Sequence, residues 1–211
     1  MHSLSNDLSD RTGEARVAAN TAVIVLDMIS AFDFEDGDRI RAHAIRIKDA
    51  LAELADRARK AGVPVIFVND NFGKWTEDFG TYVDSVRHAS DESRQLVEQI
   101  GPKPGDYHIL KPQRSAFYAT PLEVLLLTLD VKDLVLTGIT TDICVLFTAH
   151  DAYMRGYRVT VVSDCTAALN DEHHKTALEF LKRVVHAEIK KGGDVGFEDV
   201  GQRREKAGRY G

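Results

Sequence analysis

The sequence has few cysteines and no long apolar run. Its 211 residues include two cysteines, Cys144 and Cys165. They are too few for the disulfide framework of a small secreted domain, which favours a reducing compartment and a cytoplasmic protein. The apolar stretch at 122–129 is interrupted by Glu123 and is much shorter than the roughly 20 residues of a membrane span. Residues 1–20 lack the apolar core of a secretory signal, so we expect neither a membrane protein nor a secreted one.

An excess of positive charge is also missing. Lys and Arg number 27 against 33 Asp and Glu, which gives a formal net charge of −6 at pH 7. A mildly acidic chain lacks the basic surface that binds phosphate backbones, so we expect no nucleic-acid partner. The hydrophobic fraction of 44% and the charged fraction of 28% are ordinary for a globular protein. These values exclude a mostly disordered chain and a coiled coil.

Changes of composition along the chain predict one domain between two tails. A chain of this length is near the upper limit for a single hydrophobic core. Residues 1–20 are polar without periodicity and predict a flexible N-terminal arm. Residues 192–211 contain six glycines and the charged run QRREK, which predict a polar, Gly-rich C-terminal tail. The domain is therefore expected in residues 21–191.

Within that domain, apolar runs alternate with amphipathic segments. Continuous apolar runs rich in β-branched residues are typical of strands buried on both faces of a parallel sheet. We expect the strands at residues 21–28, 63–70, 107–111, 131–139, 157–165 and 187–189. We expect the helices at residues 38–60, 92–100, 121–129, 141–155 and 172–185. This alternation predicts an α/β fold, a three-layer, doubly wound, mostly parallel six-stranded sheet with helices on both faces.

Three chemically useful residues follow these strands. Asp27 ends the first strand, Lys111 ends the third, and Cys144 lies in the first turn of the helix after the fourth. Ligands of such sheets bind beyond the carboxyl ends of the strands, where these residues would meet. A thiol attacks a carbonyl as a thiolate, and an ordinary cysteine, with a pKa of about 8.5, is mostly protonated at pH 7. A helix start and the Lys111 ammonium would lower the pKa of Cys144, and Asp27 would accept its proton.

Each of these residues also has a structural interpretation. A cysteine at a helix start is commonly a small buried residue. An aspartate after a strand commonly forms a turn or a cap, and a lysine before proline is by default solvated. Their convergence on one edge of the sheet favours a catalytic site, but spacing alone leaves both interpretations open.

Longer segments extend the pattern from residue 21 to about residue 189. They read VIVLDMISAF, VIFVNDNFGKW, ILKPQRSAFYATPLEVLL and LVLTGITTDICVLFTAHDAYMRGYRVTVVSDCTAAL. In these segments the chain resembles the isochorismatase-like cysteine hydrolases. That superfamily includes nicotinamidases, N-carbamoylsarcosine amidohydrolases, biuret hydrolases and ureidoacrylate hydrolases. The last segment carries the most specific likeness, because it joins the loop before the cysteine to the following helix and strand.

The resemblance implies roles for individual residues. It makes Asp27, Lys111 and Cys144 a catalytic triad with Cys144 as the nucleophile. It also implies a cis peptide bond between Ile139 and Thr140. The backbone N–H groups of Thr140 and Cys144 would then form an oxyanion hole.

Two departures from relatives in that superfamily refine the expected reaction. Nicotinamidases hold a metal through an Asp-x-His element after the second strand and a further histidine. Here the stretch reads Asp70-Asn71-Phe72, with no histidine between it and His88, so we expect neither a metal nor another cofactor. Enzymes that hydrolyse isochorismate generally lack the cysteine, because cleaving a vinyl ether needs a proton donor. Cys144 therefore indicates hydrolysis of a C–N bond through a covalent acyl-enzyme.

A set of residues on the loops beyond the strands is expected to bind substrate, since aromatic walls with few polar groups suit a small planar ligand. They are Phe32, Asn71, Phe72, Trp75, Tyr118 and Thr140. Ordinary packing is the alternative for Phe72 and Trp75. Arg114 is expected in a structural salt bridge, with orientation of Lys111 or binding of a substrate carboxylate as the alternatives. Cys165 is expected to be a bystander, with a redox role as the alternative.

The predicted function is that of a metal-independent cysteine hydrolase acting on a small amide, carbamoyl or ureide substrate. The alternatives are an isochorismatase-type hydrolase by family name and a non-catalytic relative that uses the fold for binding or scaffolding. The resemblance also implies a homo-oligomer, a dimer or a tetramer, with no nucleic acid and no membrane among its partners. The spacing of residues leaves the identity of the substrate open.

Overall fold

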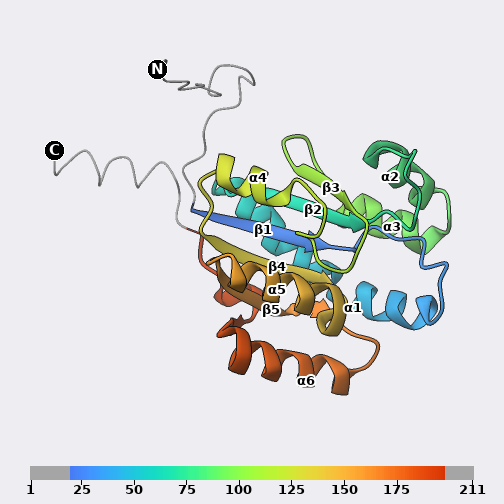
Figure 1. Cartoon of the computed structure of the whole chain (residues 1–211). Coiled ribbons are helices and arrows are strands. Elements are labelled where there is room, and N and C mark those ends of the chain that lie inside the picture. Colours follow the sequence, from blue (N-terminus) through green and yellow to red (C-terminus); the bar gives the residue numbers. More distant parts are fainter. Residues whose placement is uncertain (1–19, 198–211) are drawn as a thin grey trace, which may run out of the picture.

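A computed structural model of the protein describes residues 20–197, which form one sheet flanked by helices (Figure 1). The sheet has the order β3-β2-β1-β4-β5-β6, and all neighbouring strands are parallel. The strands are β1 (Thr21–Leu26), β2 (Val65–Asp70), β3 (Tyr107–Lys111), β4 (Asp133–Ile139), β5 (Arg158–Ala167) and β6 (Glu188–Lys190). The chain runs outward from β1 to β3 and then crosses to β4 on the other side of β1. Ligands of doubly wound sheets bind where the strand order reverses in this way.

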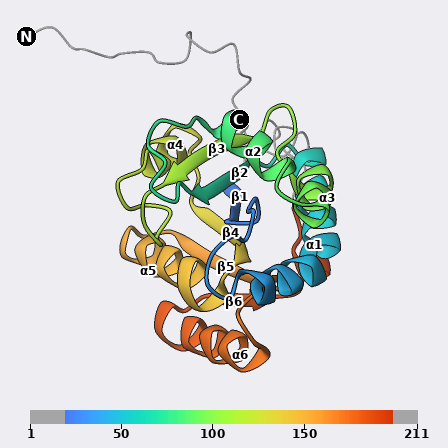
Figure 2. The ribbon, with the colours of Figure 1, turned by 90° about the vertical axis from the view of Figure 1, so that its right-hand side faces the viewer.

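The helices cover both faces of the sheet, with α1, α2 and α3 on one side and α4, α5 and α6 on the other (Figure 2). They are α1 (Gly37–Lys60), α2 (Phe79–Arg87), α3 (Asp91–Ile100), α4 (Leu122–Thr128), α5 (Leu146–Met154) and α6 (Asp171–Phe180). A single π-helical turn, η2 (Thr141–Val145), precedes α5, and another, η3 (Leu181–Val185), follows α6. The predicted three-layer α/β fold is confirmed, and its sheet is entirely parallel. None of the helices in the described residues has both the length and the apolar character that a membrane crossing requires.

The central strand β1 shows why its sequence folds this way. Its side chains alternate between the two faces, as the pleat of a strand requires. Val23 and Val25 lie in the core under α1, whereas Ala22, Ile24 and Leu26 lie in the core under α4 and α5. All five are almost fully buried, which explains why the strand reads as a continuous apolar run.

Helix α2 is an element that the sequence analysis did not expect. The helix begins after Asp78, whose side chain accepts a hydrogen bond from the Thr81 N–H at 2.8 Å. It buries Phe79, Tyr82 and Val86 against the core. These buried residues are spaced three and four positions apart, as in an amphipathic helix. The segment also contains glycine, threonine and valine, which are weak helix formers, so its sequence does not strongly predict a helix.

The two expected tails lie mostly outside the described residues. The predicted N-terminal arm, residues 1–20, is described only at residue 20. The predicted C-terminal tail, residues 192–211, differs from expectation in its described part. The guanidinium of Arg57 in α1 donates hydrogen bonds to the carbonyl oxygens of Gly192 and Val195 at 2.5 and 2.8 Å. Val195 is buried in the core, so the first residues of this segment belong to the domain.

Gly138 in β4 supplies the first testable prediction, because it has a φ of +100° next to β1. A Cβ atom there would lie 2.0 Å from the carbonyl oxygen of Leu26. We expect Gly138→Ala to lower the free energy of unfolding by at least about 3 kcal/mol in urea denaturation. The matched control is Gly193→Ala, where a Cβ meets nothing within 4 Å. Equal free energies of unfolding for the two variants would contradict the prediction, because they would show that β1 leaves room for a side chain at residue 138.

Candidate active site

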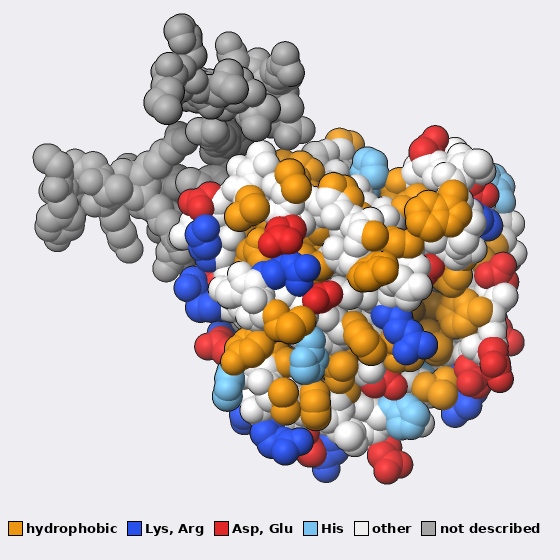
Figure 3. Space-filling view, viewed as in Figure 1, with side chains coloured by type: hydrophobic (Ala, Val, Ile, Leu, Met, Phe, Trp, Pro, Cys, Tyr) orange, Lys and Arg blue, Asp and Glu red, His pale blue; other side chains and the backbone are white. Residues whose placement is uncertain are grey.

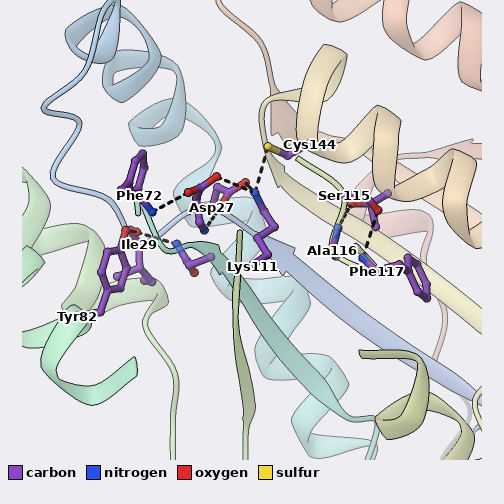
Figure 4. Close-up of polar contacts among 12 residues, drawn as sticks. Asp27, Ile29, Phe72, Tyr82, Lys111, Ser115, Ala116, Phe117 and Cys144 are labelled. Carbon is purple, nitrogen blue, oxygen red and sulfur yellow. Dashed lines mark hydrogen bonds and ion pairs between the residues drawn. The ribbon is translucent and has the colours of Figure 1, made fainter. Parts of the chain in front are cut away.

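Lys111 occupies the centre of the site at the carboxyl ends of the strands (Figure 4). Its side chain is 0% exposed, although it carries an ammonium group. The Nζ atom lies 3.0 Å from Asp27 Oδ2 and 3.5 Å from Cys144 Sγ. A buried ammonium is costly unless charged and polar groups surround it, and here they do. The three residues that the strand ends suggested therefore lie together.

Asp27 is held at the end of β1 by the backbone of β2. Its N–H donates to the Val68 carbonyl at 3.0 Å, and its Oδ1 accepts the Asp70 N–H at 2.7 Å. The residue has a φ of 52°, in the left-handed region that aspartate tolerates better than most residues. One carboxylate oxygen is thus fixed to the backbone, and the other faces Lys111.

A second carboxylate, that of Asp70, lies beside Lys111 and was not chosen by the sequence analysis. Its Oδ2 is 3.4 Å from Lys111 Nζ, and its Oδ1 accepts the Phe72 N–H at 2.7 Å. The neighbouring Asn71, which was expected to bind substrate, instead accepts the Gly73 N–H through its Oδ1 at 2.9 Å. Asp70 is the register partner of Lys111 in the paired strands β2 and β3, and this pairing would have identified it as a site residue. The register of two strands cannot be read from the sequence until their pairing is known.

Cys144 is positioned by the connection between β4 and α5. The peptide bond between Ile139 and Thr140 is cis. The Thr140 carbonyl accepts hydrogen bonds from the Ile143 and Val145 N–H groups, both at 3.1 Å. Cys144 therefore lies in the π turn η2 as a half-buried residue, and its thiol faces Lys111 and Asp27.

Burial dominates the acid–base chemistry of the site. It raises the pKa of Asp27, an effect opposed by the Lys111 ammonium and by a hydrogen bond with Cys144. Burial also raises the pKa of the Cys144 thiol far above its ordinary value, and the Asp27 carboxylate adds to this more than Lys111 offsets it. For Lys111, burial alone lowers the pKa, but its attraction to Asp27, Cys144 and Asp70 raises it overall. This direction is opposite to the lowered thiol pKa that the sequence led us to expect.

Alkylation rates test this protonation state. We expect iodoacetamide to label Cys144 at pH 7.5 at least about tenfold more slowly than free cysteine, with a rate that rises with pH, because only the thiolate reacts. Peptide mass spectrometry would separate Cys144 from Cys165, whose pKa burial raises to about 12. Urea-unfolded protein, in which both thiols react at ordinary rates, is the control. Labelling of Cys144 faster than free cysteine would contradict the raised pKa.

The candidate site opens into a cavity of about 170 Å³. The ten lining residues come from the ends of β1, β2 and β4, the adjoining loops and the start of α1. They are Asp27, Ser30, Phe34, Ile40, Asp70, Phe72, Ile139, Thr140, Ile143 and Cys144. Asp27, Cys144 and Asp70 thus share the cavity with a wall of apolar side chains.

Of the six residues expected to bind substrate, Phe72 and Thr140 line the cavity. Phe32 is buried in the core beneath it, 6.3 Å from the ring of Phe34. Trp75 and Tyr118 are 75% and 60% exposed and do not line the cavity.

Asn71, also expected to bind substrate, is buried in its turn and does not line the cavity either. Phe34, which was not expected to bind substrate, lines the cavity, whereas Trp75 and Tyr118 do not. Its ring stacks on that of Phe72, with 5.9 Å between the ring centroids.

Other charged or reactive side chains lie away from the cavity. The Arg114 guanidinium lies 5.9 Å from the ring centroid of exposed Phe147 in α5. Cys165 is fully buried, with its thiol 3.8 Å from Asp164 Oδ1. His174 Nδ1 is 2.8 Å from Thr141 Oγ1, and burial lowers the pKa of this histidine. Among residues 20–197, no group of three or more His, Cys, Asp or Glu side chains is arranged to hold a metal.

A doubly wound parallel sheet with Asp, Lys and Cys at its reversal point defines a three-layer α/β protein with a thiol site at the carboxyl ends of its strands. The family model of the isochorismatase domain matches residues 21–189. The chain therefore belongs to the isochorismatase family.

Two curated relatives cover most of the chain. YaaI of Bacillus subtilis, an uncharacterized isochorismatase family protein, is 37% identical over 171 residues, 81% of this chain and 93% of the relative. The ureidoacrylate amidohydrolase RutB of Pantoea ananatis is 28% identical over 211 residues, 82% of this chain and 81% of the relative.

Solved structures share the fold. The N-carbamoylsarcosine amidase of Thermoplasma acidophilum superposes with a TM-score of 0.64 at 28% identity, covering 83% of this chain and 98% of that structure. The nicotinamidase SaPncA of Staphylococcus aureus superposes with a TM-score of 0.65 at 26% identity, covering 82% and 98%.

Proposed function

We propose that this protein is a metal-independent cysteine amidohydrolase that cleaves a C–N bond of a small amide, carbamoyl or ureide substrate. The observation that carries the proposal is the position of Lys111, fully buried and within 3.5 Å of both the Asp27 carboxylate and the Cys144 thiol. Relatives with this fold are named as hydrolases of ureidoacrylate, N-carbamoylsarcosine and nicotinamide. These names support C–N bonds as the target.

In the first half of the proposed reaction, Asp27 accepts the thiol proton as the sulfur of Cys144 attacks the substrate carbonyl carbon. The carbonyl oxygen becomes an oxyanion, which the N–H groups of Thr140 and Cys144 would stabilise. The C–N bond then breaks, and the nitrogen leaves with the proton from Asp27. An amine or ammonia is released, and the acyl group remains on sulfur as a thioester.

In the second half, Asp27 accepts a proton from water, and the resulting hydroxide attacks the thioester carbonyl carbon. The C–S bond breaks, and the sulfur takes the proton back through Asp27. The acid product leaves, and the resting thiol and carboxylate are restored. Lys111 keeps its ammonium proton throughout and balances the negative charge that moves between Asp27 and Cys144.

The raised pKa values of Asp27 and Cys144 suit this proton transfer. An isolated carboxylate of ordinary pKa is too weak a base to deprotonate a thiol appreciably. Burial raises the pKa of Asp27 and makes it a stronger base in the cavity. Attack on substrate then consumes the thiolate as it forms, so a high resting pKa of Cys144 does not prevent reaction.

Metal independence is proposed from the side chains at the mouth of the cavity. A metal site after β2 would need nitrogen or carboxylate donors on the loop, as in the Asp-x-His element. Here the position of that histidine is occupied by Phe72, and Asp70 Oδ2 faces Lys111 Nζ at 3.4 Å. An ammonium in contact with the carboxylate would repel a metal cation.

A screen for ammonia release tests the proposed function. The panel comprises primary amides, ureides and N-carbamoyl amino acids, each incubated with enzyme in the presence and absence of a chelator such as EDTA. We expect at least one compound to be hydrolysed at the same rate in both conditions. Loss of activity with the chelator would refute metal independence. No turnover of any class would favour a binding or scaffolding role.

We also propose that the chain forms a homo-oligomer. Hydrophobic side chains gather over α4 and α5 (Figure 3). An ion pair between Glu123 of α4 and Arg155, the residue that follows α5, joins the two helices. Among the hydrophobic side chains, Leu127 of α4 and Met154 of α5 are 62% and 71% exposed. A second copy covering this surface would remove it from water. A molar mass of 23.4 kDa by light scattering at micromolar concentration would contradict the proposal.

A further inference from the structure

We propose that the cavity selects a flat, uncharged acyl group and discriminates against substrates that carry a carboxylate. This inference rests on the proposed function and specifies its substrate class. It follows from the charges and the shapes of the side chains that line the cavity.

The floor of the cavity carries an excess of negative charge. Asp27 and Asp70 contribute two carboxylates, and Lys111 contributes one ammonium that both of them share. With Cys144 as a thiol, the floor keeps one net negative charge whenever both carboxylates are ionised. An anion placed in a small, partly dehydrated cavity is repelled by such a floor more strongly than in water.

The cavity also lacks a cation that is free to bind an anion. None of the ten described residues that line it is an arginine, lysine or histidine. Lys111 lies behind this lining, fully buried, with its Nζ within 3.5 Å of Asp27, Asp70 and Cys144. Its ammonium is thus already engaged by the charged and polar groups of the site and is not exposed to the cavity as a partner for a substrate carboxylate.

The walls of the cavity favour a flat apolar group. Phe34 and Phe72 stack with an interplanar angle of 20° and a centroid separation of 5.9 Å, and they lie at the mouth of the cavity. Ile40, Ile139 and Ile143 complete the apolar lining. A planar acyl group would pack against these apolar side chains while its carbonyl carbon reaches Cys144.

This substrate class differs from those named for two relatives. Ureidoacrylate and N-carbamoylsarcosine both carry a carboxylate in addition to the bond that is cleaved. A site for such molecules needs a group that pairs with the anion, and the described lining offers none. The inference therefore separates this chain from these two relatives, but not from the nicotinamidase, whose named substrate is itself flat and uncharged.

Two substrates of nearly equal shape test the inference. 4-Nitrobenzamide is neutral, and 4-carboxybenzamide is its anionic counterpart. We expect kcat/KM of the wild-type enzyme to favour the nitro compound by at least about tenfold. Because the nitro group also activates the amide chemically, the decisive quantity is how this ratio changes between variants.

Phe34→Arg introduces a guanidinium at the mouth of the cavity, and Phe34→Leu is the matched control that removes the ring without adding charge. We expect Phe34→Arg to shift the ratio towards 4-carboxybenzamide by at least about tenfold relative to Phe34→Leu. Equal ratios in the two variants would overturn the electrostatic basis of the selection. Circular dichroism would confirm that both variants are folded.

The outcomes distinguish this inference from the proposed function. If the wild type hydrolyses 4-carboxybenzamide as well as the nitro compound or better, the inference fails and the amidohydrolase proposal stands. If neither benzamide reacts but the ammonia-release screen finds an aliphatic amide, the flat acyl group is refuted and the function stands. If neither the benzamides nor the screen show turnover, both proposals fail.

Discussion

Replacing Cys144 with alanine is expected to reduce amide turnover by at least about 1,000-fold, because it removes the sulfur that would form the proposed acyl-enzyme. The fold should survive, since the thiol lies in a partly exposed turn at the edge of the cavity. We expect the free energy of unfolding to change by no more than about 1 kcal/mol. Steady-state kinetics and urea denaturation on the same preparation measure the two effects.

Cys165→Ala is the matched control for that variant. Cys165 is 0% exposed and packs in the core away from the cavity. Its removal should cost about 1–2 kcal/mol of stability through the space it leaves, with kcat unchanged. Cys144→Ala is thus expected to lose activity but keep its stability, whereas Cys165→Ala is expected to lose stability but keep its activity. Folded Cys144→Ala enzyme with wild-type turnover would refute the nucleophile.

Replacing Lys111 with methionine is expected to impair both stability and catalysis. Methionine fills much of the same space but leaves the Asp27 and Asp70 carboxylates next to each other without a cation. Breaking a buried ion pair in this way typically costs about 3–5 kcal/mol. Without the charge that balances thiolate formation, we expect kcat/KM to fall at least about 100-fold. Lys103→Met, at a 45% exposed lysine that pairs with Asp56, is the control and should change little.

The stability loss in Lys111→Met should depend on pH. In the wild type, Lys111 lowers the pKa of Asp27 while burial raises it above 3.8. The variant loses the lowering contribution, so its folded-state pKa rises further. A carboxyl group with a raised folded-state pKa binds its proton more tightly in the folded state than in the unfolded state, so stability falls as pH rises through that range. The difference in the free energy of unfolding between wild type and Lys111→Met should therefore be smallest near pH 4 and larger at neutral pH. A difference that does not change with pH would contradict this prediction.

Much of the fold was predictable because parallel strands buried on both faces leave a strong signal. The six apolar runs match the six strands to within a few residues at each end. The carboxyl ends of these strands also identified Asp27, Lys111 and Cys144, since parallel strands place their ends at one edge of the sheet. Helix α2 was missed because residues with weak helix propensity obscured its apolar spacing.

The cavity was less predictable, because loop conformation decides which side chains enter it. Phe32 and Phe72 have φ values of 57° and 48°, which turn the chain in ways that aromatic residues rarely adopt. These turns place Phe34 in the lining and leave Trp75 exposed. The thiol pKa was mispredicted because helix position and Lys111 were considered without the larger effect of burial beside a carboxylate.

The covalent intermediate can be tested most directly by partition between water and hydroxylamine. A primary amide and its N-methyl amide share one acyl group and differ only in the nitrogen that leaves. If both react through the same thioester on Cys144, the ratio of hydroxamate to acid products must be identical for the two substrates at a fixed hydroxylamine concentration. We expect equal ratios in the wild-type enzyme and no products from Cys144→Ala. A ratio that depends on the leaving group would contradict the acyl-enzyme.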